Sequence, residues 1–180
     1  MFEFKSLQES NFEIIDNFLP EKDFENLQNL IMGEVFPWNY FPYKVHYKDD
    51  IRDFQFCHVV YHDNMIKSNF IEHFNPLLIK LNAGHLVRLK VNLTPRTDSV
   101  IHYESHIDVD HFNFTFGKTA VYYVNNNDGF TILESGEKIE SIENRLLVLN
   151  SNTKHFGTSC TNQRVRCVVN INFFPRTQYE

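Results

Sequence analysis

The sequence predicts a mainly β domain whose first half supplies helices. Three observations predict this class. Apolar residues recur at helical spacing only before about residue 85, β-rich segments follow one another from residue 86 onward, and turn residues separate these segments. Many short strands favour a sandwich or a barrel, and two helices ahead of them could cover one sheet. We expect one domain, with residues 1–85 forming a strand and supporting helices and residues 86–180 forming the β core.

The first half predicts one short strand and two helices. An apolar stretch at residues 12–18 ends just before Pro20. Residues 21–33 carry apolar side chains at helical spacing, acidic residues near the start and a glycine where a C-cap belongs. A second helical stretch runs from about residue 66 to residue 84. Asn75 and Pro76 predict a break and restart within it, because proline suits the first turn of a helix and not its interior.

The second half predicts six β segments. They are residues 86–93, 100–108, 119–124, 130–133, 146–149 and 165–174. Turn-forming residues gather between several of them, at 94–98, 125–129 and 135–136. The last segment alternates, because successive side chains of a strand point to opposite faces. One of its faces carries Arg164, Arg166, Val168, Asn170 and Asn172.

Charge and cysteine content exclude several classes of partner. The net charge is −6 and the sequence pI is about 5.8, so we expect no duplex nucleic acid and no anionic membrane as a partner. Cys57, Cys160 and Cys167 show no CxxC spacing, which indicates reduced thiols. The first residues lack a signal-peptide pattern, and no apolar run reaches membrane-spanning length. We expect a cytoplasmic protein, which would act in the host cytoplasm if a phage encodes it; its oligomeric state is left open.

Three residues form a candidate metal site. In a strand, side chains at i and i+2 share a face, so His106 and Asp108 can bind one ion together, with His155 reaching it from another strand or loop. Two imidazoles and one carboxylate hold a divalent metal by one triangular face of an octahedron, which leaves three positions open. His102 and Glu104 offer a rival pair of the same spacing in the same segment.

The surrounding residues resemble those of one family. The Y-x-x-H-x-D form at Tyr103–Asp108 is similar to the segment that carries two metal ligands in the Fe(II)/2-oxoglutarate dioxygenases, in their prolyl-hydroxylase-like branch. Further parts follow in the family's order and cover most of the chain: residues 14–20 as an entry strand, 120–125 as a core strand, 146–151 leading to Lys154-His155-Phe156-Gly157, and 166–174 as the strand with the co-substrate arginine.

This resemblance implies a double-stranded β-helix, or jelly roll, with the N-terminal helices bracing one sheet and residues 86–180 as its core. It implies Fe(II) as the metal, with 2-oxoglutarate and O2 as co-substrates. The implied reaction is hydroxylation, with release of succinate and CO2, of a peptide or protein substrate (with proline the leading residue) or of a small molecule. The matching metal ligands are His106, Asp108 and His155.

The resemblance also suggests how 2-oxoglutarate is bound. Arg166 matches the residue that binds the distal carboxylate of the co-substrate, for which a guanidinium offers two parallel donors. Tyr123 matches a hydroxyl donor to the same carboxylate, and Asn92 resembles a polar position near it. The family's usual spacing after the second histidine favours Arg164 instead. We prefer Arg166, which sits deeper in the apolar strand; an insertion at residues 158–163 would explain the offset.

Two other functions and one segment stay open. A metal-containing jelly roll could bind a ligand without turnover, although such a protein has no need of a co-substrate clamp. A zinc hydrolase also uses three protein ligands and a water, but no glutamate beside the ligands stands out as its general base, and Glu104 is left open for that role. The aromatic residues at 36–43 suit packing beneath the helices about as well as a lid or a substrate-lining role.

Overall fold

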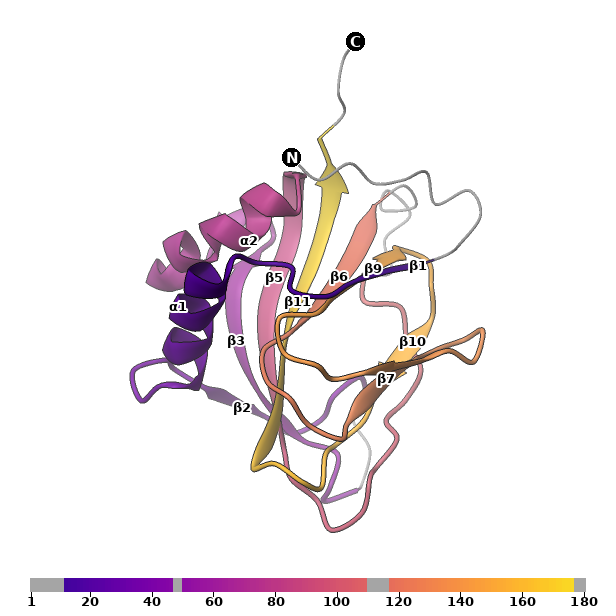
Figure 1. Ribbon diagram of the computed structural model, residues 1–180. Helices are drawn as coiled ribbons and strands as arrows, with labels where there is room; N and C mark the ends of the chain where they lie inside the picture. The colour runs from indigo at the N-terminus through magenta and orange to yellow at the C-terminus, as the bar shows by residue number, and fades with distance from the viewer. Residues whose placement is uncertain (1–11, 47–49, 110–116, 177–180) are drawn as a thin grey trace.

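Two antiparallel sheets face one another in the computed structural model, which describes residues 12–46, 50–109 and 117–176 (Figure 1). The larger sheet has the order β1 (Phe12–Ile15), β9 (Leu146–Asn150), β6 (Lys118–Tyr123), β11 (Val165–Pro175), β5 (Ala83–Pro95), β3 (Gln55–His62) and β2 (Asn39–Phe41), with β4 (Met65–Ile66) paired to β3. The smaller sheet has the order β10 (His155–Gly157), β7 (Phe130–Leu133) and β8 (Lys138–Glu140). A mainly β fold was predicted and is confirmed.

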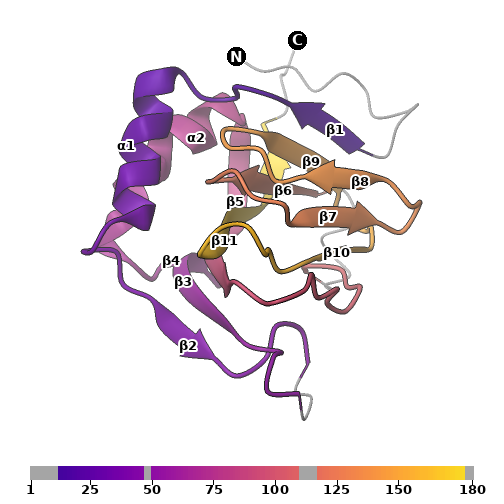
Figure 2. The same cartoon turned by 60° about the horizontal axis from the view of Figure 1, so that its bottom comes forward.

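The helices lie on one side of the larger sheet, opposite the smaller sheet (Figures 1 and 2). They are α1 (Glu21–Met32), the 3-10 helix η1 (Asn69–Phe74) and α2 (Asn75–Lys80). The predicted restart is confirmed, since α2 begins at Asn75 with Pro76 in its first turn. The expected start near residue 66 is wrong, because that residue pairs in β4 and the Ser68 hydroxyl caps η1 by accepting from the Phe70 amide.

Gly33 ends α1 without adopting a left-handed conformation. Its backbone is extended, with φ −82° and ψ 175°, and its amide donates to the Leu30 carbonyl. A Cβ at this position would lie 2.6 Å from the Asn29 carbonyl oxygen, which is closer than side-chain carbons approach backbone. Glycine is therefore needed here for space rather than for a positive φ.

Alternation along the strands of the larger sheet builds two separate cores. On β6, Ala120 and Tyr122 pack toward the helices, whereas Val121 and Tyr123 pack toward the smaller sheet. The helix-facing core continues through Cys167, Val169, Ile171 and Phe173 of β11 together with Leu27, Ile31, Leu77 and Leu81 of the helices. The inner core joins Leu147 and Leu149 of β9 to Leu133 and Ile139 of the smaller sheet. Period-two patterning thus buries both faces of the sheet.

The inner face changes character between strands. It is apolar on β6 and β9 but, apart from Val168, largely polar on the neighbouring β11 and β5. The inward side chains there are Arg166, Asn170 and Asn172 on β11, and Arg88, Lys90 and Asn92 on β5. The predicted partition of faces in β11 agrees with the apolar residues that contact the helices. Polar groups between two sheets need partners or a ligand, so this half of the sandwich is where a site is expected.

Five predicted β segments form strands, and one does not. Residues 100–108 run alongside residues 155–159 but make only two isolated bridges, His102 to Thr158 and His106 to His155. The sequence analysis missed β2, β3, β4, β8 and β10, the longest of which is β3. Because β3 hydrogen-bonds to β5, residues on both sides of position 85 share one sheet. Among the described residues, no helix is long and apolar enough to cross a membrane.

Candidate metal centre

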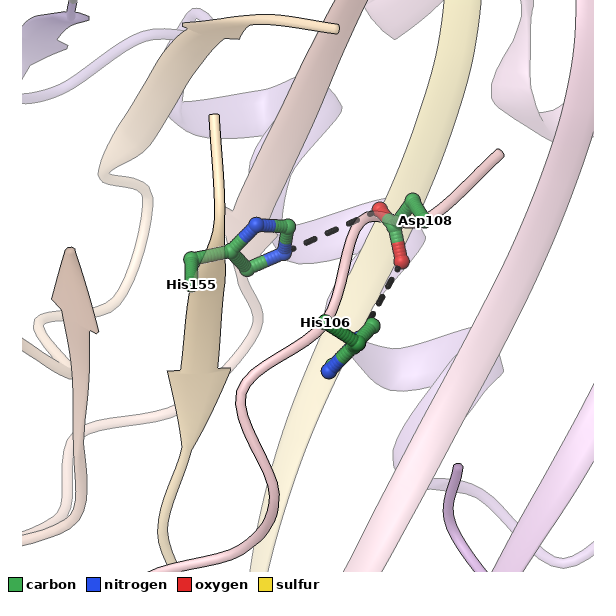
Figure 3. A group of neighbouring side chains, drawn as sticks. All are labelled: His106, Asp108 and His155. Carbon is green, nitrogen blue, oxygen red and sulfur yellow. Dashed lines mark ion pairs between the residues drawn. The ribbon is translucent and has the colours of Figure 1, made fainter. Parts of the chain in front are cut away.

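His106, Asp108 and His155 meet between the two sheets (Figure 3). His106 and Asp108 come from the extended stretch after β5, and His155 is the first residue of β10. The backbones of the two histidines exchange a pair of 3.0 Å hydrogen bonds, which fixes the two segments side by side. One ligand atom from each of the three residues lies within 4.8 Å of the others.

The spacing of these atoms suits one ion. The Asp108 carboxylate lies 3.5 Å from His106 Nε2 and 3.9 Å from His155 Nε2. With metal–ligand bonds of about 2.1 Å, adjacent ligands of an ion lie about 3 Å apart. Small side-chain movements would therefore bring the three residues to ligand distance.

Both histidines are held in the tautomer that a metal requires. His106 Nδ1 lies 3.0 Å from the Glu104 carbonyl, and His155 Nδ1 lies 3.1 Å from the Thr153 carbonyl. A carbonyl only accepts, so each Nδ1 carries the proton and each Nε2 presents its lone pair to the site. The two backbone contacts repeat the same local geometry, a bond to the residue two positions earlier.

Asp108 is an ionised carboxylate in a buried position. Its oxygens receive donors from Arg88 at 3.0 Å, Asn170 at 3.2 Å and Asn172 at 3.4 Å. Burial alone would raise the pKa of Asp108, but Arg88 and the two histidines outweigh this effect and hold it well below its usual value. Arg88 also donates to the Asn172 side chain at 2.9 Å, so the donors themselves are fixed.

The two histidines respond differently to the same carboxylate. Burial acts to lower the pKa of His106, but hydrogen bonding and attraction to Asp108 raise it overall. For His155, which is more deeply buried, desolvation dominates and the pKa is lowered despite Asp108. A neutral His155 beside an ionised Asp108 is the protonation state in which these side chains bind a metal.

The rival pair does not join this cluster. The His102 ring packs against the rings of Phe130 and Phe156, with centroids 5.5 and 5.8 Å away. Glu104 contributes its backbone carbonyl to His106, and its side chain does not line the pocket at the triad. Within the described ranges, the triad is the one group of histidine, cysteine and acidic side chains close enough to hold a metal.

A pocket opens beside the triad and contains the predicted arginine. Arg166 lines it with 6% of its surface exposed, and donates to the Ser141 hydroxyl at 2.9 Å and the Thr131 hydroxyl at 3.0 Å. Two glycines make room for this side chain. A Cβ on Gly129 would lie 2.7 Å from Arg166 Cδ, and one on Gly157 would lie 3.1 Å from a guanidinium nitrogen.

Arg166 is a buried positive charge whose side-chain hydrogen bonds go to hydroxyl groups. Within the described residues, no carboxylate forms an ion pair with it. Burial lowers its pKa, although an arginine stays protonated at any physiological pH. Arg164 lies two residues earlier in the sequence, where it is exposed and does not line the pocket. Of the two arginines considered, only Arg166 faces the triad's pocket.

The other two predicted co-substrate residues differ in position. Asn92 lines the pocket, where its side-chain oxygen accepts from the Cys57 thiol at 3.3 Å. Tyr123 is fully buried behind Arg166, with its ring 5.7 Å from the guanidinium carbon. Its hydroxyl donates to Thr131 at 2.8 Å, and it is Thr131 that lines the pocket.

Two lysines and a tyrosine complete the pocket wall and were not assigned roles from the sequence. Lys44 and Tyr103 line it near Arg166, and Lys90 lines it from β5. Alternation could have found Lys90, because it shares its strand face with Arg88 and Asn92. Lys44 follows the short strand β2 in a segment without periodicity, so no sequence pattern indicated it.

The aromatic segment at residues 36–43 divides into two parts. Phe36 is buried and packs on Trp38 and Phe70, with ring centroids 5.2 and 5.4 Å away. Tyr40 is 61% exposed and contacts Phe56 at the edge of the larger sheet. The first part is therefore core, and the second is surface that leads to the pocket residue Lys44.

Solved structures share this fold. No protein-family model and no curated protein sequence matches the chain. A prolyl hydroxylase from Trichoplax adhaerens, solved in complex with a hypoxia inducible factor peptide fragment, aligns over 93% of this chain and 85% of its own, with TM-score 0.66 and 18% identity. A Pseudomonas putida prolyl-4-hydroxylase aligns over 94% and 95%, with TM-score 0.61 and 17% identity.

A third structure extends the likeness beyond prolyl hydroxylases. An oxidoreductase of the 2OG-Fe(II) oxygenase family from Burkholderia pseudomallei aligns over 95% of this chain and 91% of its own, with TM-score 0.64 and 11% identity. The predicted jelly-roll fold is confirmed by these three likenesses. At these identities the likeness concerns the fold, so the chemistry must be argued from the residues of the site.

Proposed function

We propose that this chain is an Fe(II)- and 2-oxoglutarate-dependent dioxygenase that hydroxylates its substrate and releases succinate and CO2. The observation that carries the proposal is Arg166, a buried cation with only hydroxyl partners, placed in the same pocket as the triad. A metal site alone needs no such residue. A dicarboxylate that spans metal and cation accounts for both features of the pocket.

The donor set fits Fe(II), which two imidazoles and one carboxylate bind in non-haem oxygenases. When bound, the metal would supply oxygen activation coupled to decarboxylation of 2-oxoglutarate. The chain's own residues would hold the metal and orient its carboxylate ligand. His106, Asp108 and His155 would hold the metal on one face, while Arg88, Asn170 and Asn172 fix the carboxylate.

Arg166 would bind the distal carboxylate of 2-oxoglutarate, with Thr131 as a hydroxyl neighbour. Tyr123 would act through Thr131, since its hydroxyl donates there. Asn92 would border the co-substrate from β5. With 2-oxoglutarate bound between metal and cation, the walls formed by the two sheets would limit the access of water, which would strengthen each charged contact.

The substrate is proposed to be a peptide or protein, with proline the leading residue, or a small molecule. The first option is supported by the fold shared with prolyl hydroxylases, one of which was solved with a peptide. Tyr40 is exposed on β2, the strand that pairs with Gln55 of the pocket wall, and would contact a chain bound along this edge. Three free cysteines support a reducing compartment such as the cytoplasm.

A binding measurement tests the proposal without a known substrate. The chain is loaded with Mn(II), which replaces Fe(II) without turnover, and 2-oxoglutarate is titrated by calorimetry. We expect micromolar binding that disappears when the metal is removed, followed by succinate formation once Fe(II) and O2 are supplied. Binding that is independent of metal, or absent with it, would contradict the dioxygenase.

The same experiment separates the rival functions. A ligand-binding jelly roll would neither require metal for 2-oxoglutarate nor form succinate. A zinc hydrolase would retain Zn(II) and cleave an ester without 2-oxoglutarate. It would also need a general base, and Glu104 does not line the pocket.

A further inference from the structure

Two lysines line the pocket in addition to Arg166, and the proposed co-substrate does not account for them. Lys44 projects from the segment after β2, and Lys90 projects from the inner face of β5, opposite Asn170 of β11. Lys44 lies near the Arg166 end, because its ammonium group donates to Thr94, the residue of β5 that pairs with Arg166. Lys90 lies toward the triad, because it pairs with Asn170, whose side-chain amide donates to Asp108.

Among the residues that the structure describes, neither ammonium group has a carboxylate partner. Lys44 Nζ donates to the Thr94 hydroxyl at 2.7 Å and lies 3.9 Å from the centre of the Tyr103 ring. Across the described residues, no ion pair joins either lysine to an acid. Asp53 attracts Lys44 from beyond ion-pair distance. The acid within the pocket, Asp108, is already paired with Arg88.

Burial disfavours both charges. It lowers the pKa of Lys44 to about 7, with Arg166 and Lys90 adding repulsion, and it lowers the pKa of Lys90 as well. Burying an uncharged side chain of similar size, such as methionine, in place of either lysine would cost less free energy. Two cations held at such a place are expected where an anion completes the site.

The bound co-substrate would not supply that anion. Its distal carboxylate would be balanced by Arg166, and its other carboxylate by the metal. Lys44 and Lys90 would still lack a counter-charge after 2-oxoglutarate had entered. We propose that Lys44 and Lys90 form a second oxyanion subsite, which binds a carboxylate or phosphate group of the substrate to be oxidised. This inference rests on the proposed dioxygenase function and defines its substrate class as anionic.

Sulfate tests the subsite directly, because it stays a dianion at every pH used. It is titrated into the Mn(II)-loaded chain in the presence of saturating 2-oxoglutarate. We expect millimolar binding that persists with 2-oxoglutarate present, and that weakens at least tenfold in Lys44→Met and in Lys90→Met. Lys67→Met, which changes an exposed lysine outside the pocket, is the matched control and should bind sulfate normally.

Three results would overturn the subsite. Sulfate could fail to bind, or it could compete with 2-oxoglutarate and be lost in Arg166→Ala. Alternatively, the lysine variants could weaken 2-oxoglutarate instead of sulfate, which would assign them to the co-substrate. Each of these results leaves the metal-dependent binding of 2-oxoglutarate as a separate measurement, so the dioxygenase proposal stands or falls independently.

A turnover experiment tests the substrate class. A pool of metabolites and peptides is divided on an anion exchanger, and each fraction is added to the Fe(II)-loaded chain with 2-oxoglutarate and O2. We expect the retained, anionic fraction to raise succinate formation, and Lys44→Met and Lys90→Met to lose most of this rise. Stimulation by the unretained fraction, with the same response in both variants, would overturn the inference.

Discussion

The two ends of the pocket balance their charges in different ways. At the metal end, the Asp108 carboxylate is surrounded by Arg88, Asn170 and Asn172, and both histidine Nδ1 atoms are bound to carbonyls. At the cation end, Arg166 and Lys44 donate to hydroxyl groups. At the metal end, the hydrogen-bond partners that orient the three metal ligands are in place before a metal binds. The second end holds positive charge that its protein partners do not neutralise.

The metal end is therefore preorganised for its ion, whereas the cation end holds charges that favour the binding of an anion. Fixed donors around Asp108 and the histidines keep the ligand atoms oriented, so little rearrangement is needed when the ion enters. Buried cations with neutral partners lower the stability of the folded protein and favour the binding of an anion. Changes at the metal end should therefore abolish function outright, whereas changes at the cation end should alter affinity and stability by measurable amounts.

The largest effect is expected for Asp108→Ala. It removes the one anionic ligand and leaves Arg88 without its counter-charge. Metal binding and succinate formation should fall by at least a hundredfold, since even outer partners of metal ligands contribute 10- to 100-fold. Metal content after dialysis and succinate formation are the two measurements. Glu104→Gln is the control and should keep both; iron retained in Asp108→Ala but lost in Glu104→Gln would revive the rival pair.

A smaller effect is expected at the cation end, for Arg166→Ala. Breaking a desolvated charge pair costs about 2–5 kcal/mol, so the affinity for 2-oxoglutarate should fall at least tens of fold. Metal binding should be nearly unchanged, because the triad is untouched. Arg164→Ala should have little effect, since exposed ion pairs contribute about 0–1 kcal/mol. The 2-oxoglutarate dependence of succinate formation in both variants provides the comparison, and the reverse ranking would assign the clamp to Arg164.

The two ends also differ in how far the sequence predicts them. Spacing and resemblance predicted that His106, Asp108 and His155 would act together, and the structure brings them together. Alternation predicted that Arg166 shares a face with Asn170 and Asn172. The partners of Asp108 on β5 could not be predicted, because they depend on the register between β5 and β11, which a single strand's pattern does not contain.

The parts of the site that lie in irregular segments were the hardest to predict from the sequence. Lys44 reaches the pocket from a stretch without periodicity, and the ligand-bearing residues 100–108 are extended without being a strand. Such segments are positioned by contacts with distant residues, for example the bond from Lys44 to Thr94. Local sequence specifies the regular elements well and says little about these contacts.

The smallest effect is expected on the stability of the folded protein, in Lys44→Met. Lys44→Met should stabilise the ligand-free protein by about 1 kcal/mol below pH 7, the lower end of what replacing buried charges with apolar groups can yield. Below pH 7, Lys44 is charged in both the folded and the unfolded chain, so the wild type bears the full cost of burial. Its pKa is about 7 when folded and near 10.5 when unfolded. Between these values only the unfolded chain keeps the proton, so wild-type stability rises with pH relative to the variant.

The gain of Lys44→Met should therefore be largest below pH 7 and shrink as the pH rises toward 10. Thermal unfolding at several pH values measures it, with an expected difference of roughly 2–4 °C per kcal/mol for a chain of this size. Groups that do not interact with Lys44 act equally in both proteins and cancel in the comparison, while the loss of repulsion with Lys90 favours the variant in the same direction. Lys67→Met should show no such trend. A variant less stable than the wild type at every pH would mean that Lys44 serves packing. A gain in stability together with loss of sulfate binding would show that the charge is kept for a ligand.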